Sequence, residues 1–157
     1  MATEFTLSII KPDAVERNIT GKINAIIEDS GLKIVAQKMI LLDESEAAEF
    51  YEIHKDRPFY DALVSYMSSG AIIVQVLEGE DAVAKYRKIM GATDPKQAAN
   101  GTIRKEYGID IESNAVHGSD SIENAENEIG FFFDEEELVR VEFEDEDELE
   151  IDEEDNK

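Results

Sequence analysis

The chain has 157 residues, which is enough for one domain with a sizeable core and too few for two ordinary domains. It contains 38 acidic residues against 15 lysines and arginines, a formal net charge of −23, so most of its surface repels nucleic acid and anionic membranes. It has no cysteine, which excludes disulfides, thiolate catalysis and cysteine-based zinc sites. There is no basic, apolar leader and no apolar run of membrane-spanning length, so we expect a cytoplasmic protein without membrane association.

The first quarter of the chain alternates strand and helix patterns. Residues 3–10 predict a strand that stops at a Lys-Pro-Asp sequence. A helix is expected next, with Thr20 as its cap and Gly31 as its end. Residues 32–42 then predict a second, long strand.

Two short helices are expected after this strand. Asp43 and Glu46 have the spacing of a capping box at a helix N-terminus. Pro58 is expected to start a second helix, which Gly70 closes. The first of these helices would bury one apolar face, formed by Ala47, Phe50 and Ile53.

The next segment combines a buried strand, a helix and a long loop. Residues 71–77 are apolar except for Gln75, which is typical of a central strand. Asp81 is expected to begin a helix that ends at Gly91. Residues 91–114 show little periodicity and predict a long loop with a short helical turn, and such loops are often functional.

The last predicted elements are a short strand and a helix. Residues 114–117 indicate the strand, and Asp120 and Glu123 have a second capping-box spacing before the helix. Residues 131–133 predict either an apolar strand or a packing segment. The order of elements fits split βαβ units, an α+β sandwich with a ferredoxin-like βαββαβ core whose antiparallel sheet is covered on one face by helices.

The two histidines are the first candidates for chemistry. His54 lies in a charged stretch and is typical of a solvated residue at a helix end. His117 ends a predicted strand, is followed by Gly118 and precedes a capped helix, whose dipole and free N–H groups favour an anion. Taken alone, such a histidine is more often structural than catalytic. These features therefore indicate an anion site around His117 and no more.

Cations in this acidic chain are candidates for a phosphate site. Lys11 follows the first strand, Arg87 lies on the helix before the long loop, and Arg104 and Lys105 lie within that loop. A solvated side chain is the favoured explanation of Lys105, and an ion pair within its own helix is an alternative for Arg87. The glycine-rich phosphate motifs G-x-x-x-x-G-K-[ST] and G-x-G-x-x-G do not occur in the sequence.

One segment carries a specific resemblance. Residues 114–121, Asn-Ala-Val-His-Gly-Ser-Asp-Ser, match the N-x-x-H-G-S-D-S signature of the nucleoside diphosphate kinase family. The resemblance extends over residues 3–139. Further segments resemble that family in the same order and spacing: residues 10–13, 55–59, 91–95 and 101–104.

The resemblance implies a reaction and a nucleophile. The terminal phosphoryl group of a nucleoside triphosphate would pass to His117, and from there to a nucleoside diphosphate, in a ping-pong reaction through a phosphohistidine. It implies attack by Nδ1 of His117 and matches Glu128, Ser119 and Lys11 to the groups that complete the catalytic site. We expect Gly118 to leave room for the phosphate.

The resemblance also implies the nucleotide contacts. Asn114 and Lys11 are matched to the sugar hydroxyls, and Tyr51 to an active-site tyrosine near the lysine. Phe59 is matched to the residue that stacks on the base, which suits any base because each has a π face. An ion pair would explain Arg57 as well as a nucleotide contact does. The residues matched to phosphate contacts are Lys11, Arg87, Thr93 and Arg104.

The implied cofactor is Mg²⁺, held on the nucleotide phosphates and not by protein ligands. The implied partners are nucleoside diphosphates and triphosphates with broad base and sugar tolerance, and further copies of the chain in a hexamer or tetramer built from dimers. The net charge predicts no binding to nucleic acid. A catalytically silent nucleotide-binding or scaffold protein on the same fold is the alternative, and the complete set of matched residues favours the enzyme.

The acidic end of the chain departs from the family pattern. Residues 1–141 are expected to form the nucleoside diphosphate kinase domain. Residues 142–157 contain 11 acidic residues and are expected to form a disordered tail. Such a tail serves solvation and adaptation to high salt, as in halophilic proteins, or docking to a partner; the first is favoured because no aromatic residue follows Phe143.

Overall fold

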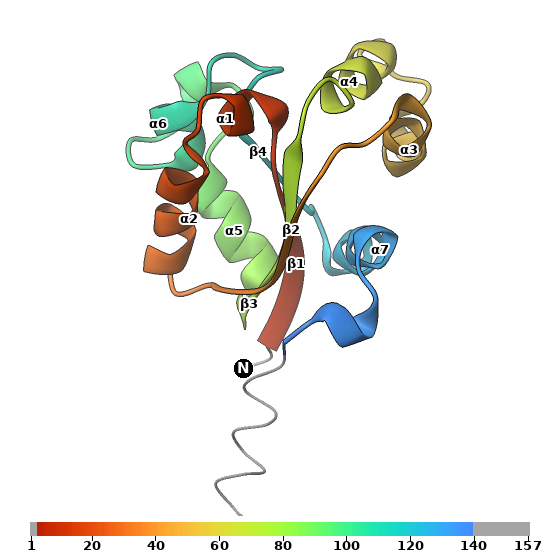
Figure 1. Ribbon diagram of the computed structural model, residues 1–157. Helices are drawn as coiled ribbons and strands as arrows, with labels where there is room; N and C mark the ends of the chain where they lie inside the picture. The colour runs from red at the N-terminus through yellow and green to blue at the C-terminus, as the bar shows by residue number, and fades with distance from the viewer. Residues whose placement is uncertain (1–2, 140–157) are drawn as a thin grey trace, which may run out of the picture.

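The computed structural model describes residues 3–139, so the predicted acidic tail, residues 142–157, lies outside the described residues. Within them, one antiparallel sheet has the strand order β2-β3-β1-β4 (Figure 1). This order and the helices between the strands confirm the predicted ferredoxin-like α+β fold. The strands are β1 (Thr3–Ile10), β2 (Lys33–Ile40), β3 (Ile72–Glu80) and β4 (Val116–Gly118).

Helices connect these strands in the predicted order. Between residues 3 and 139 there are also three single 3₁₀ turns, at Glu52–His54, Pro95–Gln97 and Glu135–Glu137. The second of these turns and α6 lie within the predicted long loop, as expected for its helical turn. The α-helices are α1 (Pro12–Glu16), α2 (Thr20–Asp29), α3 (Glu44–Phe50), α4 (Tyr60–Met67), α5 (Ala82–Met90), α6 (Ile103–Tyr107) and α7 (Ile122–Phe132).

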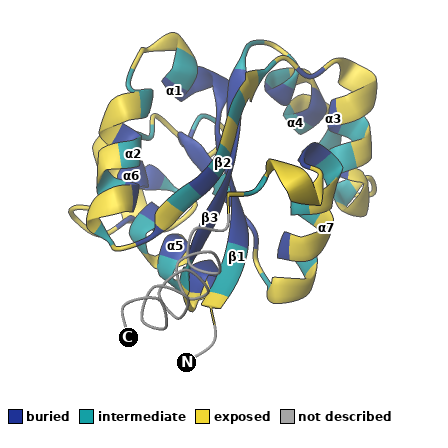
Figure 2. Cartoon of the chain, turned by 60° about the horizontal axis from the view of Figure 1, so that its bottom comes forward, coloured by how far each residue is buried: buried dark blue, intermediate teal, exposed yellow. Residues whose placement is uncertain are grey.

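Helices cover both faces of the sheet, and the expectation of one covered face was wrong. In Figure 1, α2 and α5 lie on one side of the sheet and α3, α4 and α7 on the other, and Figure 2 shows the strands buried between these layers. The reason lies in β3. Val74 and Val76 belong to the core under α3, α4 and α7, whereas Ile73 and Leu77 belong to the core under α2 and α5. An apolar run without alternation buries both faces of its strand.

Some predicted helix ends were right and others were wrong. The Asp43–Glu46 capping box is present, with both reciprocal hydrogen bonds formed. Thr20 is the first residue of α2 and caps nothing, since the cap position is Ile19. The helix after β4 is capped by Ser121, whose hydroxyl accepts from the Asn124 amide, and not by a capping box at residues 120 and 123.

Two further boundaries differ from the sequence-based expectation, and one open alternative is decided. The helix α3 stops at Phe50, so Ile53 falls in the following 3₁₀ turn and is 73% exposed, not part of an apolar face. The strand that carries His117 begins only at Val116. Residues 131–133 belong to the end of α7 and its exit, where Phe132 and Phe133 are buried, which fits the packing alternative.

Candidate active site

The nucleophile candidate, His117, is fixed by one carboxylate. It lies on β4 opposite Ile9 of β1, and its Nε2 is 2.9 Å from Glu128 Oε1 on α7. The hydroxyl of Ser119 donates to the same Oε1 over 2.8 Å and accepts from the Leu7 amide over 3.3 Å. An ionised carboxylate only accepts hydrogen bonds, so in the neutral ring Nε2 carries the hydrogen and Nδ1 keeps its lone pair.

Two aromatic rings of the α3 segment stand beside His117. The ring centroids of Phe50 and Tyr51 lie 5.7 Å and 6.1 Å from that of His117, both in edge-to-face arrangements. The Tyr51 hydroxyl is buried and has no hydrogen-bond partner among the described residues. Burial, reinforced by the charge of Glu128, raises the pKa of Tyr51, so this hydroxyl stays protonated and available as a donor.

Gly118 faces away from this site, and its expected role was wrong. A Cβ at this position would lie 2.5 Å from Met90 Sδ and 2.8 Å from Tyr86 Cδ2, both on α5. The absent side chain therefore allows β4 to approach α5 on the opposite face of the sheet. It does not make room for a phosphate beside His117.

Lys11 is held at the end of β1 by the loop that precedes β4. Its Nζ donates to Asn114 Oδ1 over 2.8 Å, and its amide donates to the Ala115 carbonyl over 2.8 Å. The Asn114 Nδ2 in turn donates to the carbonyls of Thr93 and Ile111, each over 3.0 Å. Lys11 and Asn114, which are 103 residues apart in the chain, thus form one fixed pair.

The pKa of Lys11 is lowered to about 8. Burial is the largest cause and the positive charge of Arg104 is the second, while the carboxylates of Asp13 and Glu112 oppose both. The ammonium is therefore poorly compensated within the chain. An anionic ligand beside it would supply the missing counter-charge.

A buried guanidinium lies next to Lys11. Arg104 on α6 donates from Nη1 to the Gly91 carbonyl over 3.1 Å and from Nη2 to the Val116 carbonyl over 2.9 Å. Burial lowers its pKa to about 10, and the charge of Arg87 contributes to this shift. Arg87 itself is exposed on α5, and Thr93 is exposed in the long loop. The matched phosphate contacts thus come together from β1, α5 and the loop.

A series of rings leads from His117 to the molecular surface. Tyr51 lies 6.5 Å from His54, and His54 lies 5.7 Å from Phe59, measured between ring centroids. Phe59 is 49% exposed at the start of α4, as a base-stacking residue would be. His54 was interpreted as a solvated helix-end residue, but it is half-buried between these rings. Arg57 forms no ion pair with any described residue.

Two further features bear on cofactor and membrane. Within residues 3–139, no three histidine or acidic side chains gather closely enough to bind a metal ion. No helix in that part of the chain has the length and apolarity needed to cross a membrane.

Known proteins similar to this chain belong to the same family that the motif at residues 114–121 indicates. Residues 4–138 match the model of the family described as nucleoside diphosphate kinase. The chain belongs to the nucleoside diphosphate kinase family. It is therefore an enzyme of the phosphotransferase class that acts on nucleotides and needs a divalent cation, and the silent scaffold is not supported.

Individual relatives are similar over nearly their whole length. The nucleoside diphosphate kinase of Gluconacetobacter diazotrophicus is 64% identical over 139 residues, which cover 88% of this chain and 99% of that protein. That of a Wolbachia strain from Drosophila simulans is 68% identical, covering 88% of this chain and 100% of the relative.

Solved structures of the family share the fold. The nucleoside diphosphate kinase of Aquifex aeolicus has a TM-score of 0.85 and 46% identity, covering 88% of this chain and 100% of that one. A halophilic nucleoside diphosphate kinase from Halobacterium salinarum, solved in complex with CDP, has a TM-score of 0.83 and 46% identity, covering 88% and 92%.

Sequence reasoning did not single out three residues that contact this site. Phe50 packs against His117, while Asp13 and Tyr66 form a polar network beneath Lys11 and Asn114. Asp13 had a signal, since it follows Lys11-Pro12 directly, but that signal was interpreted only as the end of a strand. Tyr66 lies on α4 and carries no motif.

Proposed function

We propose that this enzyme transfers the terminal phosphoryl group of a nucleoside triphosphate to a nucleoside diphosphate through a phosphate on Nδ1 of His117. The observation that supports this most strongly is the bond from His117 Nε2 to Glu128. It leaves the Nδ1 lone pair as the nucleophile and fixes the plane of the ring. Ser119 fixes the carboxylate in turn.

In the first half-reaction, Nδ1 of His117 attacks the γ-phosphorus. A nitrogen–phosphorus bond forms while the bond from the γ-phosphorus to the β,γ-bridging oxygen breaks, and its electron pair leaves with the diphosphate. The ring becomes positively charged, and the Glu128 carboxylate stabilises that charge through Nε2–H. A second nucleoside diphosphate attacks the phosphohistidine with a terminal oxygen and reverses these steps.

The cations around the site would offset the charge of the phosphates. Lys11, Arg87 and Arg104, with the hydroxyl of Thr93, suit the oxygens of the transferring group. Asn114 and Lys11 would bind the sugar hydroxyls, and Phe59 would stack on the base. These donors suit phosphate and not a metal ion, so we infer that the divalent cation is Mg²⁺ carried on the nucleotide phosphates, where it adds positive charge.

We also infer a homo-oligomer in the cytoplasm, a hexamer or tetramer built from dimers. Large apolar side chains exposed on the described surface, among them Met39, Leu41 and Ile109, support subunit contacts. A mass measurement in solution decides the number of subunits.

The domain boundary at residue 141 is supported by the family match, which ends at residue 138. From the net charge of −23 we predict no binding to nucleic acid.

The test is a labelling experiment. With γ-labelled ATP and Mg²⁺, the protein should acquire acid-labile, base-stable label that an added nucleoside diphosphate removes. His117→Ala should abolish both the label and the transfer, whereas His54→Ala, which changes the only other histidine, should still be labelled. Label that persists in His117→Ala would refute the mechanism.

A further inference from the structure

The backbone makes a strained turn immediately before the strand of His117. Ala115 has φ 74°, a conformation that L-residues rarely adopt. The Val116 amide donates to the Asn114 carbonyl over 2.9 Å, which closes a three-residue γ-turn around Ala115. Strained conformations of this kind persist only where the surrounding structure holds them in place.

The turn is held at three points by two segments, the start of α1 and α6. The Lys11 amide donates to the Ala115 carbonyl, and Arg104 donates to the Val116 carbonyl. The Ala115 amide donates to Asp13 Oδ2 over 3.2 Å. Asp13 is the side chain that holds the central residue of the turn itself.

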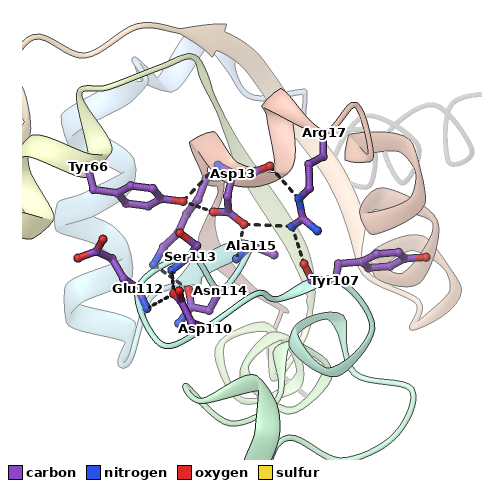
Figure 3. A network of polar contacts seen from close by, with 10 residues as sticks. Asp13, Arg17, Tyr66, Tyr107, Asp110, Glu112, Ser113, Asn114 and Ala115 are labelled. Atoms are coloured by element: carbon purple, nitrogen blue, oxygen red, sulfur yellow. Dashed lines mark hydrogen bonds and ion pairs between the residues drawn. The ribbon is translucent and has the colours of Figure 1, made fainter.

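Asp13 is buried. Both oxygens of its carboxylate accept hydrogen bonds, as Figure 3 shows. Its Oδ2 also accepts from Arg17 Nη2 over 3.2 Å, and its Oδ1 accepts from the Tyr66 hydroxyl. The Asp13 amide donates back to the Tyr66 oxygen over 3.2 Å. Because Tyr66 lies on α4, the helix that follows Phe59, one carboxylate joins the base-stacking side of the site to the turn.

We propose that Asp13 is a positioning residue for phosphoryl transfer: its carboxylate holds the turn at Ala115 and so sets Asn114 and His117 in place relative to Lys11. The proposal rests on the function proposed above for these three residues. Asp13 forms hydrogen bonds with Ala115, Arg17 and Tyr66 and with none of the matched phosphate contacts, so apart from its charge near Lys11 it reaches the reaction through the backbone.

The loss of Asp13 should act on geometry. An alanine freed from the carboxylate favours negative φ, which moves Asn114 and the start of β4. His117 is the second residue after Ala115, so a shift of the turn is passed to the nucleophile. A misplacement of about 1 Å costs on the order of 100-fold in rate for a reaction that depends on in-line attack.

The experiment compares Asp13 variants in two backgrounds. The measured quantity is the single-turnover rate of His117 labelling by γ-labelled ATP at saturating concentration, with circular dichroism as the check on folding. Asp13→Ala should lower this rate about 100-fold. Asp13→Asn should stay within about tenfold, because its Oδ1 can accept from Ala115 while its Nδ2 donates to the Tyr66 oxygen.

The second background is Ala115→Gly. Glycine adopts positive φ without steric cost, so the turn needs less help from the carboxylate. The fold-decrease in labelling rate caused by Asp13→Ala should therefore be at least about ten times smaller in the Ala115→Gly background than in the parent. A purely structural role of Asp13 would change thermal stability in both backgrounds and leave the labelling rate of the folded fraction unchanged.

The outcomes separate this proposal from the proposed function. A parent enzyme that is not labelled on His117 would refute the phosphohistidine mechanism and the positioning role with it. If the parent is labelled, two results would overturn the positioning role alone. One is a labelling rate of Asp13→Ala within about threefold of the parent rate. The other is the same fold-decrease on Asp13→Ala in the Ala115→Gly background as in the parent. Should Asp13→Ala not fold, Asp13→Ser serves in its place, because the serine hydroxyl fills part of the space but is too short to reach the Ala115 amide.

Discussion

At the residue scale, the contact between His117 and Glu128 decides which ring nitrogen can react. Glu128→Ala should lower kcat by about tenfold or more, because the ring loses its fixed orientation and the charge that stabilises its positive form. The kcat of Glu128→Gln should lie between those of the parent enzyme and Glu128→Ala, since the glutamine amide oxygen still accepts from Nε2–H. Glu126→Ala, an exposed glutamate on the same helix, is the matched control. Equal kcat values for all three variants would contradict the assigned role of Glu128.

Also at the residue scale, the ionisation of Lys11 should make kcat/KM depend on pH. Its pKa of about 8 means that the ammonium is present below pH 8 and lost above it, so kcat/KM should fall as pH rises through this value. Arg104 lowers this pKa while Asp13 and Glu112 raise it. Asp13→Asn should therefore move the alkaline decline of kcat/KM to lower pH.

A control variant isolates the lysine in this pH profile. Lys11→Arg keeps its charge at alkaline pH and should show a lower but nearly pH-independent rate between pH 7 and about 10. If its decline coincided with that of the parent enzyme, another group would be responsible.

At the scale of elements, the packing of β4 on α5 depends on Gly118. Gly118→Ala should destabilise the fold by about 1–3 kcal/mol, because its Cβ would overlap Met90 and Tyr86. The added change Met90→Ala should make Gly118→Ala less costly by making room. Gly130→Ala, with open space around an exposed position on α7, should instead stabilise by about 0.5–1 kcal/mol. Urea unfolding measures all of these, and equal effects of the two glycine changes would contradict the packing role.

Much of the element order could be predicted from the sequence, because its signals are local. Alternation in β1 and the Asp43–Glu46 spacing needed no tertiary information. The burial of both faces of the sheet was missed because no single strand encodes the helices that cover it, although residues 71–77, apolar except for Gln75, pointed to it. The γ-turn at Ala115 could not be predicted, since neither glycine nor asparagine marks its central residue.

The same distinction holds for the site. His117, Ser119 and Glu128 lie within one strand–helix segment; the motif contains the first two, and the wider family resemblance matched Glu128. The hydrogen bond from the Ala115 amide to the Asp13 carboxylate spans 102 residues, and it appears only once the register of β1 against β4 is known. Gly118 lies inside the motif, yet a glycine is needed there because the helix α5 packs closely against it, and not because of the substrate.

At the scale of the whole molecule, the net charge of −23 opposes the compact state. Added salt should raise the melting temperature, because the screening length falls from about 10 Å at 0.1 M to about 3 Å at 1 M. Residues 142–157 carry 11 acidic residues and one lysine, so a chain cut after residue 141 should show a weaker dependence on salt. A melting temperature that stayed flat or fell as NaCl rose would contradict this account.

The whole molecule must also bind a highly charged substrate while repelling anions over most of its surface. Lys11, Arg87 and Arg104 come from three parts of the fold. Arg104 is close enough to Lys11 and to Arg87 for their charges to interact, and it donates to the carbonyl of Val116, the residue before His117. The most direct test of this account is the position of the phosphate after brief reaction with a nucleoside triphosphate, determined by NMR of the intact phosphoprotein. We predict phosphorus bonded to Nδ1 of His117. Phosphorus on Nε2, or on any other residue, would contradict the account.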